Sequence, residues 1–354
     1  MVRRGIVRLS AAAAVALAFA VAGCGSGGGS SDSSSASSSS SNGGVQSSIT
    51  LGINNPNYAT QWAIFVAEDL GYLKDAGIQN VKVVTTDNFV QGLVGGSLDI
   101  SQGDTDQWLN AAYKSNKDIV YLGTYRDHEW HILGAKKGIT NAQQLVGQNL
   151  TAGERGGRNE FVMRTELQSL GVDPNKVKWV PLGGGSDARL QALINGQVAG
   201  ASIFPRHIQP LEQAGGKVLY QKLTKVPQEG IAVMGDYLKQ NRATVMAYLK
   251  ATLKARQFIA DPAHKQQVLD IMRKHKFDIP PEFASQYMVE VRQISPDGGF
   301  VPAQMDQLVK EEANLGLMPK DLDWRKFTDL GPLYDAQKAA GMQQRPTPQE
   351  VQGS

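Results

Sequence analysis

Cysteine is almost absent from this chain, which carries a single one, Cys24, among its 354 residues. That excludes an internal disulfide and a cysteine-rich metal centre. A net basic charge is also lacking: 36 Lys and Arg face 33 Asp and Glu, and residues 1–23 hold three of the arginines and no acid. The remainder is therefore neutral (3 − 3 = 0), so we expect no nucleic-acid partner.

No apolar run reaches the ~20 residues that a membrane-spanning helix needs. The longest, Leu9–Val21, follows Arg3, Arg4 and Arg8, which is typical of a signal peptide over residues 1–23. It closes on Val21-Ala22-Gly23-Cys24, which resembles the lipobox of bacterial lipoproteins. A lone cysteine can instead be a small buried hydrophobic residue. Its place after the signal peptide favours lipidation of Cys24, an extracytoplasmic location, and a membrane contact through the lipid alone.

Residues 24–48 are nearly all Ser and Gly after the cysteine, which predicts a flexible linker. Its reach is on the order of 25–30 Å for about two dozen residues. The folded part therefore begins near residue 49.

A group of residues recurs one hundred positions further along the chain. The second copy has Gln191, Leu193, Gly196 and Val198 where the first has Gln91, Leu93, Gly96 and Leu98, an offset of 191 − 91 = 100. At the same offset, Leu170-Gly171 corresponds to Leu70-Gly71. Such a spacing indicates a duplicated unit, because solenoid repeats have periods of about 20–50 residues. Each copy has the pattern strand, helix, strand, helix, strand. We predict these elements at 49–53, 62–70, 81–85, 88–95 and 98–101, and again at 149–152, 158–170, 177–181, 187–195 and 198–204.

Strands that alternate with helices predict an α/β fold with two lobes, each a mostly parallel sheet flanked by helices. After residue 225 we predict one more strand, at 231–234, and then several amphipathic helices. The predicted organisation is a first lobe of 49–127 and 227–345, a second lobe of 128–226, and a flexible tail of 346–354.

Four segments, in order, resemble one family: the periplasmic binding proteins for aliphatic sulfonates, taurine, nitrate and thiamine-precursor pyrimidines. They are Ala67–Gly77, Gly95–Ile100, Leu145–Leu150 and Gln191–Val198. Leu73 stands where the family usually has Phe, and Ala199 where it usually has Asp. The resemblance implies a type II periplasmic binding protein fold whose lobes close on a solute about two crossover strands. It also implies delivery to the permease and ATPase of an ABC importer. Our predicted hinges are residues 125–129 and 224–230.

Candidate ligand residues follow from the rule that ligands bind at the carboxyl ends of parallel strands. In the first lobe the rule selects Asn54, Asn55, Tyr58, Gln61, Trp62, Asp87, Gln102 and Asp104. In the second lobe it selects Arg155, Gly157, Arg158, Asn159 and Phe204. Trp62 also fits the apolar face of its helix, so it is either a core residue or a ligand contact.

The charges among these candidates suggest two kinds of ligand. The turn Gly153–Arg158 offers backbone N–H groups at a helix start and two arginines, which suit an anion. The carboxylates of Asp104 and nearby Asp106 would instead favour an amine. We therefore expect a small organic anion or zwitterion such as a sulfonate or taurine, with an aminopyrimidine as the next choice.

Motifs for catalysis or metal binding are incomplete. His128 and His131 lack a second ligand cluster, and Gly200–Phe204 lacks the final glycine of a nucleophile elbow. We expect a monomer with no catalytic residue, no metal and no cofactor. Two alternatives remain: an enzyme that resembles thiamine-pyrimidine synthases, and a binding protein that senses its ligand for a membrane kinase.

Overall fold

The computed structural model describes residues 44–54, 59–183, 185–277, 279 and 281–353. The predicted signal peptide, Cys24 and most of the Ser/Gly linker lie outside these residues. None of the described helices has the length and apolar character needed to cross a membrane.

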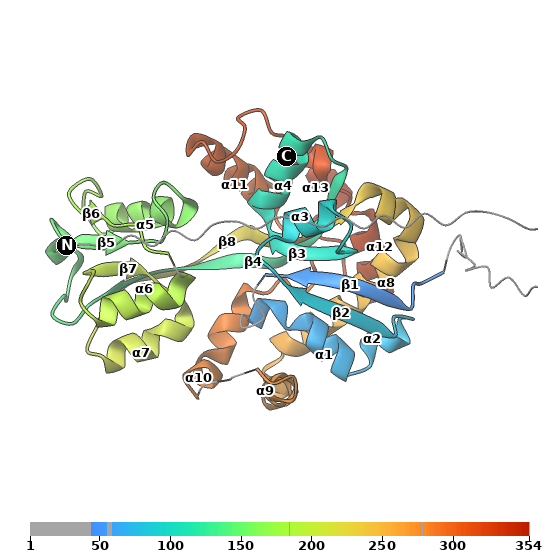
Figure 1. Cartoon of the computed structure of the whole chain (residues 1–354), viewed down its shortest axis with the longest axis horizontal. Helices are drawn as coiled ribbons and strands as arrows, with labels where there is room; N and C mark the ends of the chain where they lie inside the picture. The colour runs from blue at the N-terminus through green and yellow to red at the C-terminus, as the bar shows by residue number, and fades with distance from the viewer. Residues whose placement is uncertain (1–43, 55–58, 184, 278, 280, 354) are drawn as a thin grey trace, which may run out of the picture. The chain divides into compact units, whose positions relative to one another are not determined.

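The centre of the fold is one continuous sheet of eight strands (Figure 1). The strands are β1 (Ser48–Ile53), β2 (Asn80–Thr85), β3 (Ile100–Asp104), β4 (Ile119–Ala135), β5 (Asn149–Thr151), β6 (Lys178–Trp179), β7 (Gly200–Ser202) and β8 (Lys217–Met234). Their order is β2-β1-β3-β8-β4-β7-β5-β6. β1 pairs in parallel with β2 and β3, and β5 pairs in parallel with β6 and β7. We call the half with β1–β3 the first lobe and the half with β5–β7 the second lobe.

Two long strands, β4 and β8, belong to both lobes. They pair antiparallel from Ile119↔Met234 at one end to Ala135↔Lys217 at the other. The predicted hinges, 125–129 and 224–230, lie in the middle of these strands. The sequence patterns revealed only the last part of β8, because both strands cross two different environments and have no single alternation of apolar residues.

Helices cover both faces of each half of the sheet. They are α1 (Ala63–Asp69), α2 (Tyr72–Asp75), α3 (Phe89–Val94), α4 (Thr105–Ser115), α5 (Arg158–Ser169), α6 (Gly185–Ile194), α7 (Ile208–Gln213), α8 (Gly235–Ala260), α9 (Lys265–Lys274), α10 (Pro281–Glu290), α11 (Pro302–Asn314), α12 (Gly331–Ala339) and α13 (Pro348–Gly353). Short 3₁₀ turns are η1 (Ala59–Gln61), η2 (Ala142–Leu145), η3 (Pro205–His207), η4 (Pro262–His264), η5 (Val291–Gln293) and η6 (Trp324–Phe327). The segment predicted as a flexible tail contains α13.

The sequence duplication reappears in the backbone. Gly71 and Gly171, which follow α1 and α5, have φ of 78° and 74°, and Gly96 and Gly196 both have φ of 72°. Only glycine adopts this left-handed conformation without steric cost. The matching pairs thus end corresponding helices in the two lobes.

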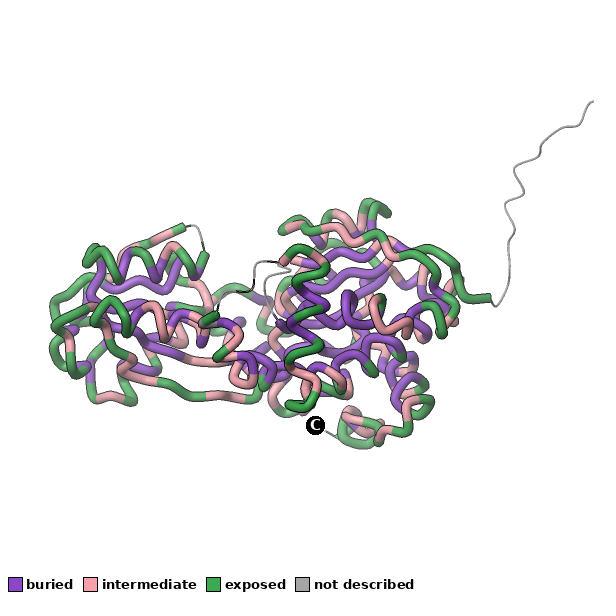
Figure 2. The backbone as a smooth tube through the Cα atoms, turned by 90° about the horizontal axis from the view of Figure 1, so that it is seen from below, coloured by how far each residue is buried: buried purple, intermediate pink, exposed green. Residues whose placement is uncertain are grey.

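The lobes have separate apolar cores (Figure 2). The first-lobe core joins β1, β3 and α1 to the long helix α8 and to α12. In the second lobe, adjacent residues Ile132 and Leu133 of β4 belong to different clusters. This is the alternation expected of a strand with helices on both faces.

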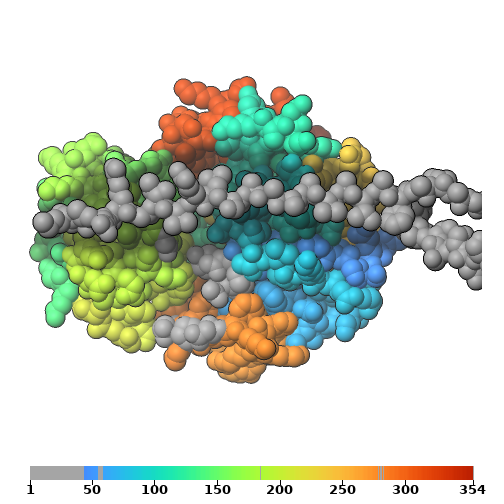
Figure 3. Space-filling model, viewed as in Figure 1, coloured from blue at the N-terminus to red at the C-terminus, as the bar shows by residue number. Residues whose placement is uncertain are grey.

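The C-terminal helices also contact the second lobe. In Figure 1, α11 lies above the shared strands and α10 lies below them, and Figure 3 shows the atoms of the C-terminal part, in orange and red, at the top and the bottom of the same view. Trp130 donates its indole N–H to the carbonyl of Val289 at 3.0 Å, and the N–H of Arg206 donates to Glu290 at 3.1 Å. The second lobe is therefore held to the first by side-chain contacts as well as by β4 and β8.

Gly230 of β8 gives a test of this packing. A Cβ placed there would lie 2.0 Å from the buried ring of Tyr121, which leaves no room for a methyl group. We expect Gly230→Ala to lower the free energy of unfolding by about 2 kcal/mol, as for other overpacked cores. Urea denaturation measures it. Gly183→Ala, where no atom lies within 4 Å, is the control and should be neutral. Equal effects of the two substitutions would contradict the packing explanation.

Candidate functional site

The carboxyl ends of the parallel strands from both lobes converge on β4 and β8. β1 ends at Ile53 and β3 at Asp104, whereas β5 ends at Thr151 and β7 at Ser202. The loops that follow these strands, and the middle of β4 and β8, form the candidate site.

A row of three charged residues crosses the sheet at this point. Asp104 of β3 lies opposite Glu229 of β8, which lies opposite Arg126 of β4. Arg126 contacts Glu229 at 3.0 Å and donates to the amide oxygen of Gln293 at 2.9 Å. Arg126 and Glu229 are both buried. Each is therefore held by a partner of opposite charge, as buried ions require.

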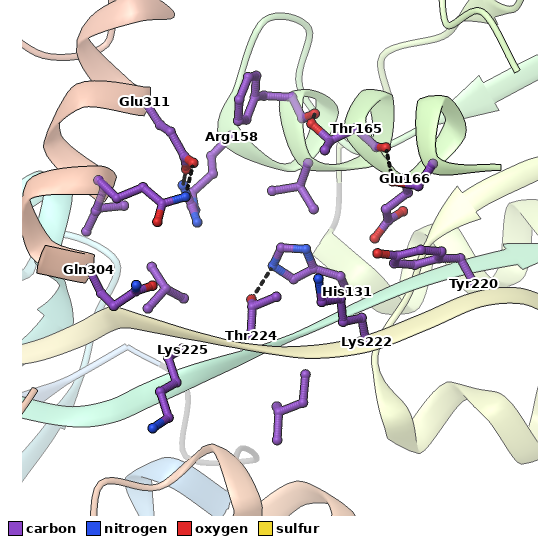
Figure 4. A pocket seen from close by; sticks show the side chains of 17 residues that line it. His131, Arg158, Thr165, Glu166, Tyr220, Lys222, Thr224, Lys225, Gln304 and Glu311 are labelled. Atoms are coloured by element: carbon purple, nitrogen blue, oxygen red, sulfur yellow. Dashed lines mark hydrogen bonds and ion pairs between the residues drawn. The ribbon is translucent and has the colours of Figure 1, made fainter. Parts of the chain in front are cut away.

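Arg158 forms a second charged centre. As the first residue of α5, it lies between three carboxylates: Glu129 of β4 at 3.3 Å, and Glu311 and Glu312 of α11 at 3.4 Å each. Its side chain is 12% exposed. Because α5 belongs to the second lobe and α11 packs with the first, Arg158 bridges the lobes. Figure 4 shows the contact with Glu311.

Carboxylates outnumber cations in this region. Six of them, Asp104, Asp106, Glu129, Glu229, Glu311 and Glu312, surround the two guanidinium groups of Arg126 and Arg158. We call these eight side chains the charged cluster. Both arginines are already matched by carboxylates, so the cluster as a whole attracts positive charge.

The pKa values of the cluster respond to this excess. Burial, and then the neighbouring carboxylates of Asp106 and Glu229, raise the pKa of Asp104 well above its usual value. Burial and Asp106 raise that of Glu312 to about 7. Glu129 differs: burial acts to raise its pKa, but Arg158, His131 and Arg126 outweigh burial and lower it to about 2. The electrostatic environment therefore differs from one carboxylate to the next: the pKa values of Asp104, Asp106 and Glu312 are raised, whereas that of Glu129 is lowered.

Several predicted ligand residues adjoin the cluster. Gln61 donates from Nε2 to the Asn54 side chain at 2.8 Å and to the Tyr125 hydroxyl at 2.6 Å. Gln61 is fully buried, and its Oε1 has no hydrogen-bond partner in the described part of the chain. The guanidinium of Arg126 lies 5.9 Å from the centre of the Phe204 ring. Asn54, Gln61, Asp104, Arg158 and Phe204 are thus brought together from both lobes.

Other predicted residues lie elsewhere. Trp62 is fully buried and packs against Phe283, with ring centres 5.1 Å apart, and Gln102 is buried with its Nε2 donating to the Tyr248 hydroxyl. Arg155 and Asn159 are exposed, as is Asp87, which lies on the outer surface of α3 and α4. Gly157 precedes α5 and begins it with extended backbone. Asn55 and Tyr58 are outside the described residues.

The sequence analysis missed most of the charged cluster. Arg126, Glu129 and Glu229 fall within the predicted hinges but were not predicted as site residues, since no strand end pointed to them. Glu311 and Glu312 lie more than 150 residues from Arg158, and their sequence carries no signal of the contact. Among the described residues, no group of three His, Cys, Asp or Glu side chains is placed to hold a metal ion.

Comparisons with known proteins agree with this architecture. The family model described as "NMT1/THI5 like" matches residues 57–265. A search of curated proteins found no match. Among solved structures, the chain is similar to the periplasmic sulfonate-binding protein SsuA of Methylobacillus flagellatus KT, with 18% identity and a TM-score of 0.65, covering 84% of this chain and 96% of that one.

Two further structures have similar scores. The periplasmic nitrate-binding protein NrtA of Synechocystis PCC 6803 is 14% identical, with a TM-score of 0.63 and coverage of 83% and 89%. The periplasmic aliphatic sulphonate-binding protein SsuA of Escherichia coli is 17% identical, with a TM-score of 0.61 and coverage of 80% and 92%. At these identities the likeness concerns the fold, which is that of periplasmic binding proteins. The predicted fold class is confirmed.

Arg158 and Arg155 give a matched test of the charged cluster. We expect Arg158→Ala to lower the free energy of unfolding by about 3 kcal/mol, because it leaves buried carboxylates without their cation. The loss should be smaller at pH 5 than at pH 8, because Glu312, with a pKa of about 7, accepts a proton in that interval and relieves the repulsion. Denaturation curves at both pH values measure it.

Arg155→Ala is the control. This arginine belongs to the same turn, but its side chain is 47% exposed, and its partner Glu160 also has Arg164. We expect a change within about 0.5 kcal/mol. Similar losses for the two variants would mean that the carboxylates around Arg158 contribute nothing to its role.

Proposed function

We propose, because this chain belongs to the NMT1/THI5-like family and has the fold of periplasmic binding proteins, that it captures a small organic solute and delivers it to an ABC importer. The solute binds between the lobes, and its partners are the importer's permease and ATPase. The chain acts as a monomer, by binding and release and without catalysis.

The observation that carries the proposal is the charged cluster, which gathers residues of both lobes around Arg126, Glu129 and Glu229 of the two shared strands. Register shifts interrupt the β4–β8 pairing between Tyr121 and Gly123, between Thr124 and Arg126, and between Arg126 and His128. Such irregularities bend strands locally. Residues 125–129 and 224–230 are thus our hinges, and rotation about them would open and close the space around the cluster. We retain 49–127 with 227–345 and 128–226 as the two lobes.

The proposed ligand contacts are Asn54, Asn55, Tyr58, Gln61, Asp104, Gly157, Arg158 and Phe204 from the sequence analysis, to which we add Tyr125, Arg126 and Glu229. We leave out Trp62 and Gln102, which are buried in the first-lobe core, and the exposed Asp87, Arg155 and Asn159.

The charge of the cluster narrows the ligand class. Related structures are named for sulfonate and nitrate, but here the arginines that would hold such anions are occupied by Glu229, Glu129, Glu311 and Glu312. An amine would satisfy the Oε1 atom of Gln61, and it would add a cation beside Asp104, whose Oδ2 accepts from Gln107 at 2.8 Å and whose pKa is raised by burial and by neighbouring carboxylates. We therefore favour a zwitterion such as taurine, or an amine-bearing solute such as an aminopyrimidine, over a simple anion.

The protein's place in the cell follows from its N-terminal residues. We propose that the signal peptide 1–23 is removed and that Cys24 is lipidated, which leaves the folded part outside the cytoplasm on a Ser/Gly tether. A diacylglyceryl group meets the requirement of two chains for stable anchoring.

A stability screen of the full-length Cys24→Ser chain tests the binding proposal. The matched solutes are ethanesulfonate, taurine and ethanolamine, with nitrate and aminopyrimidines added. A solute at 100 times its Kd adds about 2.7 kcal/mol to the stability of the folded state. We expect a rise in Tm with amine-bearing members and none with ethanesulfonate, and Asp104→Asn should reduce the rise.

Two other outcomes are informative. Stabilisation by ethanesulfonate alone would contradict the amine preference but leave solute capture intact. A flat response to every solute would contradict capture of this class altogether.

Membrane fractionation tests the anchor. We expect the wild-type chain in the membrane fraction and the Cys24→Ser chain in the soluble extracytoplasmic fraction, because that substitution removes the sulfur that would carry the lipid. Retention of the variant in the membrane would show that another feature holds the protein there.

A further inference from the structure

A separate cavity lies beside the shared strands (Figure 4). Its volume is about 570 Å³, within the range of small-molecule sites. One wall is α5, from Arg158 to Ser169, and the facing wall is α11, from Gln304 to Glu311. The remaining lining comes from His131 of β4 and residues 220–226 of β8. The cavity thus starts at Arg158 and Glu311 of the charged cluster and runs along the side of α5, and Glu166 lies about two helical turns from Arg158.

Glu166 is the unusual feature of this cavity. Its side chain lies in the lining but is only 3% exposed, and its Oε2 has no hydrogen-bond partner among the described residues. No Lys, Arg or His of the described chain forms an ion pair with it, in contrast to Glu129 and Glu311 nearby. Burial and then the charge of Glu129 raise its pKa to about 8. A buried carboxyl group with no partner is costly and calls for an explanation.

The other residues of the lining indicate which kind of ligand would pair with Glu166. Apolar surface comes from Phe161, Val162 and Leu308, and Tyr220 adds an aromatic ring to the lining (Figure 4). Such a surface accepts a short apolar body, and the carboxyl group accepts a donor at one end.

The lysines of the lining have a different explanation. Lys222 and Lys225 are exposed residues of β8, which pairs with β3 only at residues 229–232. The 217–228 part of β8 is thus an edge of the sheet in the described structure. Lysines on an edge strand prevent unwanted strand pairing. Their presence does not require a role as partners of Glu166, and neither Lys222 nor Lys225 forms an ion pair with Glu166 in the described structure.

We propose that this cavity is a second binding site, specific for a small organic amine whose ammonium group pairs with Glu166. Arg158 lines both this cavity and the proposed solute site, but Glu166 forms no hydrogen bond or ion pair with any ligand residue assigned there, so a test at Glu166 examines this cavity separately. An amine bound in this cavity would contact α5 of the second lobe and α11, which packs with the first lobe, at the same time.

Disulfide exchange tests the charge preference directly, since the Cys24→Ser chain has no other cysteine. Ser169 lines the cavity one helical turn from Glu166 and on the same side of α5, so Ser169→Cys places a thiol near the carboxyl group. The full-length Cys24→Ser/Ser169→Cys chain is equilibrated with equal amounts of cystamine and bis(2-hydroxyethyl) disulfide. After proteolysis at low pH, which stops further exchange, the masses of the peptide that contains residue 169 give the ratio of the amine adduct to the alcohol adduct.

We expect the amine adduct to exceed the alcohol adduct about five-fold, the ratio that a difference of ~1 kcal/mol produces. Adding Glu166→Gln should return the ratio to that of an exposed reference cysteine, Gln197→Cys. Adding Glu154→Gln, which removes an exposed carboxylate of the same lobe, should leave the preference intact. Unchanged Tm values show that the variants fold, and Val162→Cys replaces Ser169→Cys if the latter does not.

A ratio near that of the reference cysteine, or a preference that survives Glu166→Gln, would overturn the proposal. Either result concerns this cavity alone, and the solute screen would be unaffected.

Discussion

The antiparallel pairing of β4 with β8 is the interaction on which the rest of the structure depends. Its hydrogen bonds continue from Ile119↔Met234 in the first lobe to Ala135↔Lys217 in the second, so each lobe is built on the same two strands. The pairing places Arg126 opposite Glu229, and the β3–β8 pairing adds Asp104 to the same row. The charged cluster is therefore a consequence of strand register, and a shift by one residue would turn these side chains to the other face.

Each buried charge needs a partner of opposite charge, and the members of the charged cluster differ in how many such partners they have. Arg158 has three carboxylates, whereas Asp104 faces Glu229 and Asp106. The guanidinium that bridges the lobes thus has three carboxylate partners, whereas Oε1 of Gln61 and Oε2 of Glu312 have no hydrogen-bond partner among the described residues. The fold alone therefore does not decide the charge of this region, because the charge depends on the side chains that the fold carries.

The duplication explains the symmetry of the two lobes, and the C-terminal helices break it. Gly71 and Gly171, and Gly96 and Gly196, make equivalent turns in the two halves. No duplicated partner corresponds to α11, which supplies Glu311 and Glu312 to Arg158 and forms one wall of the cavity beside α5. The features that distinguish this chain from a simple pair of lobes therefore come from the segment added after the repeat.

Local patterns in the sequence were enough to predict the strand, helix, strand, helix, strand order of the repeated unit in each lobe, the glycine turns and the α/β class, but not β4, α4, α7 or most of β8. Apolar periodicity and the conformational freedom of glycine act over a few neighbouring residues. They can therefore be recognised in the sequence without knowledge of the tertiary structure. The same reasoning identified Asp104 and Arg158, which directly follow strands or begin a helix. It could not reveal Arg126, Glu229, Glu311 and Glu312 as their partners, nor that Trp62 and Gln102 are core residues. Those outcomes depend on strand register and on helix packing between residues more than 100 positions apart, and only the tertiary structure decides them.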